Sequence, residues 1–184
     1  MKIKLIASAF FLCCFNTFAS AQALATVESL DVPRYMGTWY EVAKFPNWFQ
    51  KKCVGDTRAD YSLAADGKVQ VINRCRLANG EFDQANGTAR QIGAADSPKL
   101  EVSFAPGWLS FLPLVWGNYW VVDIDAAYQL VAVSEPGREY LWILSRTPSI
   151  DPQAYERLVA RLAAQGLDTG KLEITRQGDG AAIR

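Results

Sequence analysis

The chain has 184 residues, half of them apolar, and its 19 basic residues balance its 19 acidic residues, so the formal net charge is zero. This length and apolar content allow one hydrophobic core of ordinary size, and the lack of excess positive charge argues against a nucleic-acid partner. The sequence contains no histidine, which excludes Ser-His-Asp and Cys-His catalytic sites, His-ligated haem and histidine-containing zinc sites.

Residues 1–21 are typical of a secretory signal peptide. Lys2 and Lys4 make a positively charged start, residues 5–15 form an apolar run, and Ala19-Ser20-Ala21 fits a cleavage site. We therefore expect the mature chain to begin at Gln22, with 17 basic and 19 acidic residues once the two leader lysines are removed. An exported protein follows from this prediction.

Two cysteines in the leader leave a second kind of export signal open. Cys13 or Cys14 would carry the lipid in a bacterial lipoprotein, although the residues before them, Phe11-Leu12, are bulkier than that signal requires. The expected mature chain, residues 22–184, contains no linker, repeat or low-complexity tract. We predict that it forms a single domain.

The mature chain is dominated by short runs of aromatic and β-branched residues, separated by Gly, Pro, Asp or Asn. Eight such runs predict strands at residues 37–45, 57–63, 69–75, 84–92, 100–104, 118–124, 128–134 and 140–146. Sequential strands of this kind favour an antiparallel meander. Closure into an up-and-down barrel would remove its two exposed edges, and a β-sandwich is the alternative that the strand count leaves open.

Cys53 and Cys75 flank the first predicted hairpin, whose turn falls at residues 64–67. Folding the chain at that turn brings the two cysteines close to each other at the far end of the hairpin. An even pair of cysteines in an exported protein indicates a disulfide. Two free thiols are the alternative in a reducing compartment.

The 21 residues from Val102 to Val122 carry no charge. This length suits a membrane span, but Pro106, Gly107, Pro113 and Gly117 would repeatedly break a helix. Two other interpretations remain: a loop that packs back on the barrel, or an apolar lip that contacts a membrane interface or a second copy of the chain. The lip would consist of Trp108, Leu109, Phe111, Leu112, Leu114, Val115 and Trp116.

A change of period after the strands predicts one amphipathic helix. Asp151 is a suitable N-cap, Pro152 suits the first helical position, and Gly166 ends the pattern. We expect the helix to pack on the outside of the sheet, before a last short strand at residues 171–175. The apolar stripe of the predicted helix consists of Tyr155, Leu158, Val159 and Leu162.

Three stretches, in this order and spacing, resemble the signature motifs of the lipocalin family. They are "VPRYMGTWYEVAKF" with Gly37-Thr38-Trp39, "DIDAAYQLVAV", and "YLWILSRTPSI" with Arg146. The resemblance covers about residues 30–176 and is greatest to the bacterial outer-membrane, apolipoprotein D-like lipocalins. Asp125-Ala126-Ala127-Tyr128 departs from the Asp-Tyr-x-x-Tyr of the second motif, which puts the role of Asp125 in question.

The resemblance implies an all-β fold: an eight-stranded antiparallel up-and-down barrel with one C-terminal α-helix packed outside. It places Gly37, Trp39 and Arg146 at the barrel floor, where the indole closes the cavity and the guanidinium lies over its face. These three residues are predicted to be structural, as core residues are. A periplasmic or outer-membrane-associated location is also implied.

Strand alternation from Arg146 assigns the inner face of the last strand, and the same pattern assigns the inner face of the fifth. The residues predicted to line an apolar, aromatic ligand cavity are Leu100, Val102, Phe104, Tyr140, Trp142 and Leu144. Loops at residues 46–56, 76–83, 105–117 and 135–139 would surround its mouth. Near it lie five cations that would either meet an anionic head group or remain solvated surface charges: Lys44, Lys51, Lys52, Arg74 and Arg76.

The predicted function is that of a non-catalytic carrier that holds a fatty acid, lysophospholipid or similar amphiphile, for lipid storage or transport linked to membrane maintenance. A structural or membrane-contact module that uses the apolar lip is one alternative. An enzyme acting on a hydrophobic substrate is another, although the sequence offers no nucleophile and base in a recognisable arrangement. No metal or redox cofactor is predicted.

Overall fold

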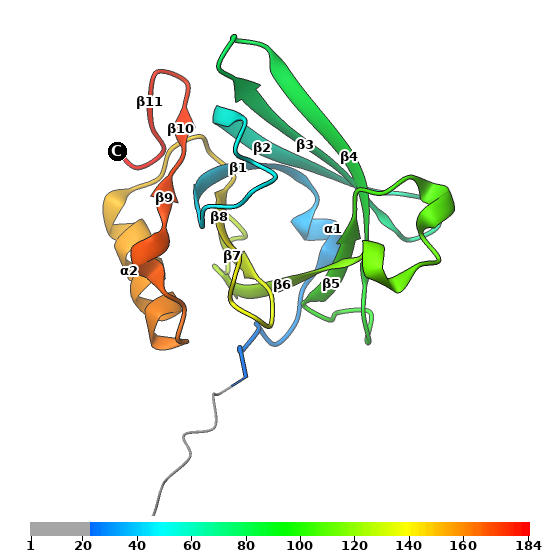
Figure 1. Cartoon of the computed structure of the whole chain (residues 1–184). Helices are drawn as coiled ribbons and strands as arrows, with labels where there is room; N and C mark the ends of the chain where they lie inside the picture. The colour runs from blue at the N-terminus through cyan, green and yellow to red at the C-terminus, as the bar shows by residue number, and fades with distance from the viewer. Residues whose placement is uncertain (1–22) are drawn as a thin grey trace, which may run out of the picture.

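Eight antiparallel strands close into a barrel in the computed structural model, which describes residues 23–184 (Figure 1). The predicted signal peptide, with Cys13 and Cys14, lies outside the described residues. Strand β1 pairs with both β2 and β8, so the up-and-down barrel is confirmed and the sandwich is wrong. The strands are β1 Gly37–Lys44, β2 Cys53–Leu63, β3 Val69–Leu77, β4 Phe82–Gln91, β5 Lys99–Ser103, β6 Gly117–Ile124, β7 Leu130–Ser134 and β8 Leu141–Ser145.

Strand β1 changes partner half-way along its length. Its first four residues pair with β2, whereas Ala43 and Lys44 pair with β9, a short strand at Glu173–Ile174 outside the barrel. The register with β8 shifts between Glu41 and Ala43. Strand β10, at Arg176–Gln177, pairs with β11, at Gly180–Ala181. The C-terminal segment therefore takes the place of β2 beside the second half of β1.

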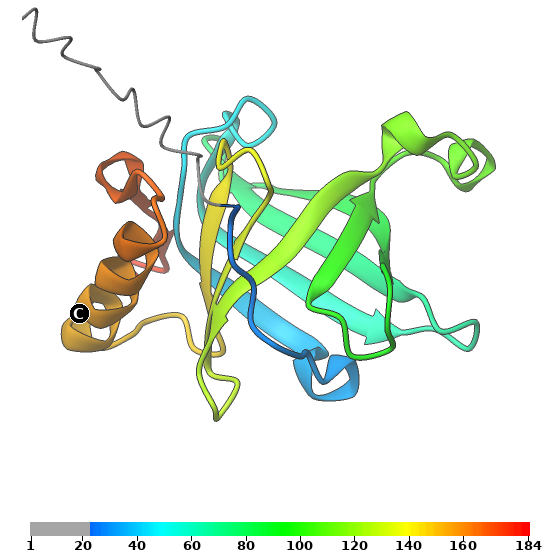
Figure 2. The ribbon, with the colours of Figure 1, turned by 90° about the horizontal axis from the view of Figure 1, so that it is seen from below.

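Helix α2, at Pro152–Ala164, packs outside the barrel as predicted (Figure 2). Asp151 caps it by accepting a hydrogen bond of 2.9 Å from the amide of Ala154. Leu158 and Leu162 are fully buried in a cluster with the outward-facing side chains of β6, β7 and β8. A second cluster of buried side chains lies inside the barrel, so the sheet has a core on each face here.

The hairpin of β2 and β3 turns at the predicted residues, where the amide of Gly67 donates to the carbonyl oxygen of Ala64. Leu63 pairs with Val69 and Tyr61 with Val71, and shifts in register follow nearer the mouth. Cys53 and Cys75 are joined by a disulfide, with 5.5 Å between their α-carbons. The predicted pairing is confirmed, and it fastens the end of the hairpin farthest from the turn.

Several short elements were not predicted. Helix α1, at Val32–Tyr35, enters the barrel floor, and 3₁₀ turns form at Gly107–Leu109, Pro113–Val115 and Thr169–Lys171. The uncharged stretch is divided between the end of β5, two of these turns and β6. In residues 23–184, no helix is long and apolar enough to span a membrane.

Candidate functional site in the barrel

A cavity of about 980 Å³ occupies the barrel and opens at one end. Residues of the loops after β1, β5 and β7 line its opening, together with Asp83 at the start of β4. The wall below them is mainly apolar, which suits a hydrophobic ligand. All six residues predicted to contact the ligand lie on this wall: Leu100, Val102, Phe104, Tyr140, Trp142 and Leu144.

Trp39 and Arg146 close the floor as predicted. Trp39 is 0% exposed, and the guanidinium carbon of Arg146 lies 3.9 Å from the centroid of its ring. Arg146 also donates hydrogen bonds to the carbonyl oxygens of Thr38 (3.0 Å) and Tyr35 (3.1 Å). Gly37 has φ +99°, and an added Cβ would lie 3.2 Å from an Arg146 nitrogen. Glycine therefore serves here for both its backbone conformation and its lack of a side chain.

Asp125 keeps a structural role although the motif around it departs from the family pattern. Its carboxylate accepts hydrogen bonds from the amides of Ala127 (3.0 Å) and Gln129 (2.6 Å) in the turn between β6 and β7. Tyr128, between Ala127 and Gln129 in that turn, has φ +57°, and its hydroxyl oxygen accepts a hydrogen bond from the amide of Asp31. The turn is thus connected to the segment that leads into α1.

The upper wall carries three aromatic rings in mutual contact. Tyr140 and Trp142 are stacked with their centroids 5.8 Å apart, and the ring of Phe49 lies 6.1 Å from that of Trp142. Across the barrel, Phe104 packs over Gly87, where an added Cβ would come within 2.7 Å of the phenyl ring. These rings make a broad apolar contact surface just inside the mouth.

A buried carboxylate, which the sequence analysis did not identify, lies behind this aromatic wall. Glu41 is 2% exposed and lines the cavity. Its two oxygens accept hydrogen bonds from Gln50 (2.7 Å) and Thr175 (2.6 Å). Gln50 in turn accepts a hydrogen bond of 3.0 Å from the indole of Trp142. This network connects the first mouth loop to β1, β8 and the C-terminal segment. The alternation of side chains along the strand was the signal that could have placed Glu41 on the same inner face as Trp39.

Burial raises the pKa of Glu41, against the opposing effect of its hydrogen bonds with Thr175 and Gln50. A carboxyl group whose pKa is raised on folding binds its proton more tightly in the folded state. Its contribution to stability is therefore fully present below the pKa of the unfolded chain and is lost as the pH rises through the raised folded pKa. We expect Glu41→Gln to remove this loss, because an amide does not ionise; it also keeps one donor and one acceptor for the same two partners.

Urea unfolding of the wild type and Glu41→Gln at pH 5 and pH 8 checks this expectation. The urea concentration at the unfolding midpoint of the wild type, measured relative to that of the variant, should decrease from pH 5 to pH 8. The same relative midpoint at both pH values would show that Glu41 has an ordinary pKa in the folded state.

A cluster of three tyrosines lies at the deep end of the cavity, and the sequence analysis did not identify it. Tyr35 comes from α1, Tyr61 from β2 and Tyr119 from β6. The hydroxyl oxygen of Tyr119 lies 2.7 Å from that of Tyr35 and 3.1 Å from that of Tyr61. The ring of Tyr35 also packs on Trp39, with 5.0 Å between the centroids. The cluster therefore forms the upper surface of the floor.

The cations predicted near the mouth are mostly paired with acidic side chains. Lys52 and Arg74 line the cavity, whereas Lys44, Lys51 and Arg76 do not. Salt bridges join Lys52 to Asp83 (2.7 Å), Lys44 to Glu173 (3.1 Å), Arg76 to Asp56 (2.6 Å) and Arg74 to Asp60. An anionic head group would thus compete with existing carboxylates for Lys52 and Arg74.

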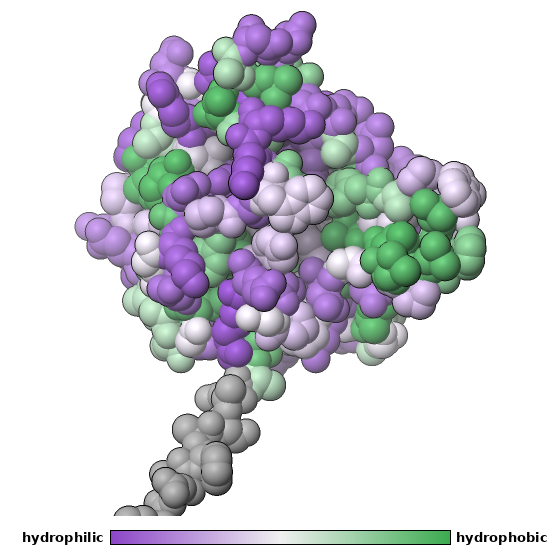
Figure 3. All heavy atoms as spheres, in the orientation of Figure 1, coloured by the Kyte–Doolittle hydropathy of each residue, from purple (hydrophilic) through white to green (hydrophobic). Residues whose placement is uncertain are grey.

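The predicted apolar lip projects from the barrel and does not fold back over it (Figures 1 and 2). Trp108 and Phe111 are each 74% exposed and Leu114 is 84% exposed, whereas the other members, Leu109, Leu112, Val115 and Trp116, are half-buried. Apolar surface over this loop is visible at the right of Figure 3. Trp116 differs from the prediction, because its ring lies under the guanidinium of Arg90 and its indole donates to the carbonyl oxygen of Ser110.

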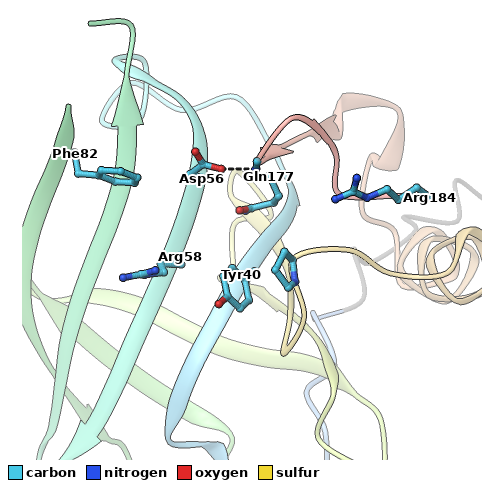
Figure 4. Close-up of a pocket in the computed structure, with 8 residues that line it drawn as sticks. Tyr40, Asp56, Arg58, Phe82, Gln177 and Arg184 are labelled. Atoms are coloured by element: carbon cyan, nitrogen blue, oxygen red, sulfur yellow. Dashed lines mark hydrogen bonds between the residues drawn. The ribbon is translucent and has the colours of Figure 1, made fainter. Parts of the chain in front are cut away.

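A second pocket, of about 290 Å³, lies outside the barrel beside the C-terminal segment (Figure 4). Asp56 accepts a hydrogen bond there from the amide of Gly178, and Gln177 donates to the carbonyl oxygens of Glu41 and Thr57. These contacts attach the segment to β1 and β2. Because Asp56 and Gln177 already bond to the backbone here, we interpret this pocket as a packing seam and the barrel cavity as the functional site.

Comparisons with known proteins agree with this geometry. Residues 30–177 match the family model of the lipocalin-like domain. The chain is 42% identical over 158 residues to temperature-induced lipocalin-1 of Arabidopsis thaliana, covering 85% of this chain and 84% of that protein. It is 35% identical to the outer membrane lipoprotein Blc of Escherichia coli, covering 89% of each. The structure of insecticyanin from Manduca sexta, at 19% identity, has the same fold, with a TM-score of 0.68 over 89% of each chain.

Proposed function

This chain belongs to the lipocalin family, whose members are mainly binding proteins for small hydrophobic molecules, and on this premise we propose that it is a non-catalytic lipid carrier. The ligand is a fatty acid, lysophospholipid or similar amphiphile, held for storage or transport linked to membrane maintenance. Its acyl chain lies in the barrel and its head group lies at the mouth.

The observation that carries this proposal is the size and lining of the cavity. About 980 Å³ of space, open at one end and lined by aliphatic and aromatic side chains, accommodates a long acyl chain. Each buried methylene contributes roughly 0.8 kcal/mol before the costs of binding are subtracted. The charged residues that line the cavity include Lys52, Arg74 and Glu139, which suits an amphiphile whose polar end faces solvent.

We further propose that the protein is exported and acts in the periplasm or at the outer membrane, with residues 22–184 forming one lipocalin domain. The leader-like sequence at residues 1–21 supports export. A relative at 35% identity is named an outer membrane lipoprotein, which supports the location.

Replacing Trp142 or Phe104 with alanine is expected to weaken the binding of palmitate or lysophosphatidylcholine. Each substitution removes an aromatic surface that faces the cavity, and we expect a loss of roughly tenfold in affinity for about 1.4 kcal/mol of lost contact. Titration calorimetry measures the affinities. Trp142→Ala also removes the hydrogen bond to Gln50, so Phe104→Ala is the cleaner of the two.

Phe82→Ala is the matched control, because Phe82 is 60% exposed and does not line the barrel cavity. Its affinity should equal that of the wild type. Unchanged affinity in both cavity variants would place the ligand elsewhere, and absence of lipid binding by the wild type would contradict the carrier function itself.

The exposed lip supports a second role at the same end of the barrel. Trp108 and Phe111 are three-quarters exposed beside the cavity mouth, and apolar surfaces of this kind mark membrane or protein contacts. Tryptophan is also favoured at the level of lipid head groups. We propose that the lip contacts a membrane interface, where lipid is collected or delivered, or a second copy of the chain.

The double variant Trp108→Ser/Phe111→Ser is expected to show reduced association with anionic vesicles or a reduced dimer content. Its thermal unfolding should stay close to that of the wild type, because both side chains are already exposed. Vesicle flotation and analytical ultracentrifugation separate the two contacts. Leu63→Ser, at a 50% exposed site at the other end of the barrel, is the control. A double variant that unfolds several degrees lower and associates as before would contradict the lip.

A further inference from the structure

The tyrosine cluster puts three polar hydroxyl groups at the deep end of the cavity, where the surrounding wall is apolar. Tyr35 is 3% exposed and Tyr61 is 9% exposed, and both line the cavity together with Tyr119. The side chains around them on the cavity wall are aliphatic or thioether: Val32, Met36, Val69, Val71 and Leu100. Three hydroxyl groups therefore meet where the far end of a long ligand would lie.

The hydroxyl groups have one more proton than their mutual hydrogen bonds use. Burial raises the pKa of all three phenols, that of Tyr61 to about 12, so each keeps its proton at neutral pH. The cluster then holds three O–H donors. Two hydrogen bonds join them, one between Tyr119 and Tyr35 and one between Tyr119 and Tyr61, and either oxygen of each pair can be the donor. In residues 23–184 no other protein group makes a hydrogen bond with any of these three hydroxyl groups, so one O–H donor is left without an acceptor.

An unused donor in a buried site favours a ligand that brings an oxygen atom to it. The methyl end of an unmodified acyl chain cannot accept the hydrogen bond. A hydroxyl group can accept it and can also donate to a phenol oxygen, so it uses both kinds of site that the cluster offers. The cluster therefore distinguishes a hydroxylated tail from a plain one.

The charges near the floor argue against a ligand that binds with its carboxylate at the deep end. A buried carboxylate needs a cation or several donors. Arg146 lies below the cluster, but its guanidinium donates to the backbone carbonyl oxygens of Arg34, Tyr35, Thr38 and Tyr128 and stacks on Trp39. The neutral phenols thus suit an uncharged oxygen.

We propose that Tyr35, Tyr61 and Tyr119 form a subsite for the hydroxyl group of a long-chain lipid that is hydroxylated near the end of its tail. The subsite rests on the proposed carrier function, because the ligand enters from the mouth and extends to the floor. It narrows the ligand class from acyl lipids in general to those with an oxygenated tail.

The test compares palmitate with 16-hydroxypalmitate in the wild type and in the variant Tyr35→Phe/Tyr61→Phe/Tyr119→Phe. Phenylalanine keeps the rings and removes the three hydroxyl groups together, which leaves no unpaired partner behind. Titration calorimetry gives the ratio of the two dissociation constants for each protein. We expect the wild type to favour 16-hydroxypalmitate and the variant to reduce that preference about tenfold, the effect of one hydrogen bond.

Asn73→Ala is the matched control. Asn73 is a polar residue of the cavity wall outside the cluster, and its Oδ1 is buried without a hydrogen-bond partner. It lies between Ala59 and Ala85 on the neighbouring strands. The preference for 16-hydroxypalmitate should survive this change. If it is lost here and not in the tyrosine variant, Asn73 binds the hydroxyl group and the proposal is overturned.

The remaining outcomes separate this proposal from the carrier function. Equal affinity of the wild type for both lipids, with palmitate bound, would mean that the ligand's hydroxyl group gains nothing from the unused donor, and it would overturn the subsite alone. Binding of neither lipid would overturn both proposals. Should the triple variant not fold, the wild type is titrated with 2-hydroxypalmitate, whose hydroxyl group lies beside the head group; a preference over palmitate as large as that for 16-hydroxypalmitate would overturn the subsite.

Discussion

Replacing Trp39 with alanine is expected to lower the free energy of unfolding by about 3–5 kcal/mol, the range for deletion of a large buried aromatic side chain. Trp39 is 0% exposed and packs against Tyr35 and Arg146. Its indole also donates a hydrogen bond of 2.9 Å to the carbonyl oxygen of Tyr35. The substitution would leave a cavity under the floor and would free the Arg146 guanidinium from its ring contact.

Equilibrium unfolding in urea measures this effect, with fluorescence and circular dichroism as separate probes. Trp120→Ala is a suitable comparison, because Trp120 is a half-buried ring that faces outward under Lys99, and its loss should cost less. Arg146→Lys should also destabilise the protein, because lysine cannot reproduce the fork of donors to four carbonyl oxygens. A Trp39→Ala midpoint equal to that of the wild type would show that the floor does not depend on this ring.

Removing the disulfide is expected to have the second largest effect, a loss of about 3 kcal/mol for a loop of 22 residues in the chain-entropy account. The bond holds the mouth end of β2 to β3, where shifts interrupt the regular strand pairing. The variant Cys53→Ser/Cys75→Ser should therefore unfold at a lower urea concentration than the oxidised wild type.

The reduced wild type is the matched control, and its midpoint should approach that of the double variant. Alkylation without reductant, followed by intact-mass analysis, checks the bond directly in protein recovered from an oxidising compartment. Cys53 and Cys75 should remain unmodified. Alkylation at both cysteines, or a double variant as stable as the oxidised wild type, would contradict the expected stabilisation.

Local patterns in the sequence were sufficient for most of the barrel. Alternation of side chains and the turn residues between runs located all eight strands to within a few residues of their observed bounds. The hairpin turn at residues 64–67 set the register that brings Cys53 near Cys75. The spacing of Leu158 and Leu162 identified the helix and its buried face. Each of these features depends on neighbours in the chain, which is why sequence alone indicates it.

Other parts of the candidate site were beyond local patterns. Alternation could have placed Glu41 on the inner face, but no local pattern indicated that Gln50 and Thr175 would donate to it, because Gln50 lies in an irregular loop and Thr175 is 134 residues away in the chain. Trp116 resembled the other lip residues in the sequence, and only the folded structure shows that the guanidinium of Arg90, on β4, lies over its ring.

The sequence by itself determined the order of the strands, the inner and outer faces of β5 and β8, the disulfide and the closure of the floor by Trp39 and Arg146. The tertiary structure alone decided that the hydroxyl groups of Tyr35, Tyr61 and Tyr119 meet. Those residues stand on a short helix and on two strands that lie apart in the sheet order. Their convergence depends on the curvature and stagger of the closed barrel, which arise from the pairing of all eight strands and from no single stretch of the chain.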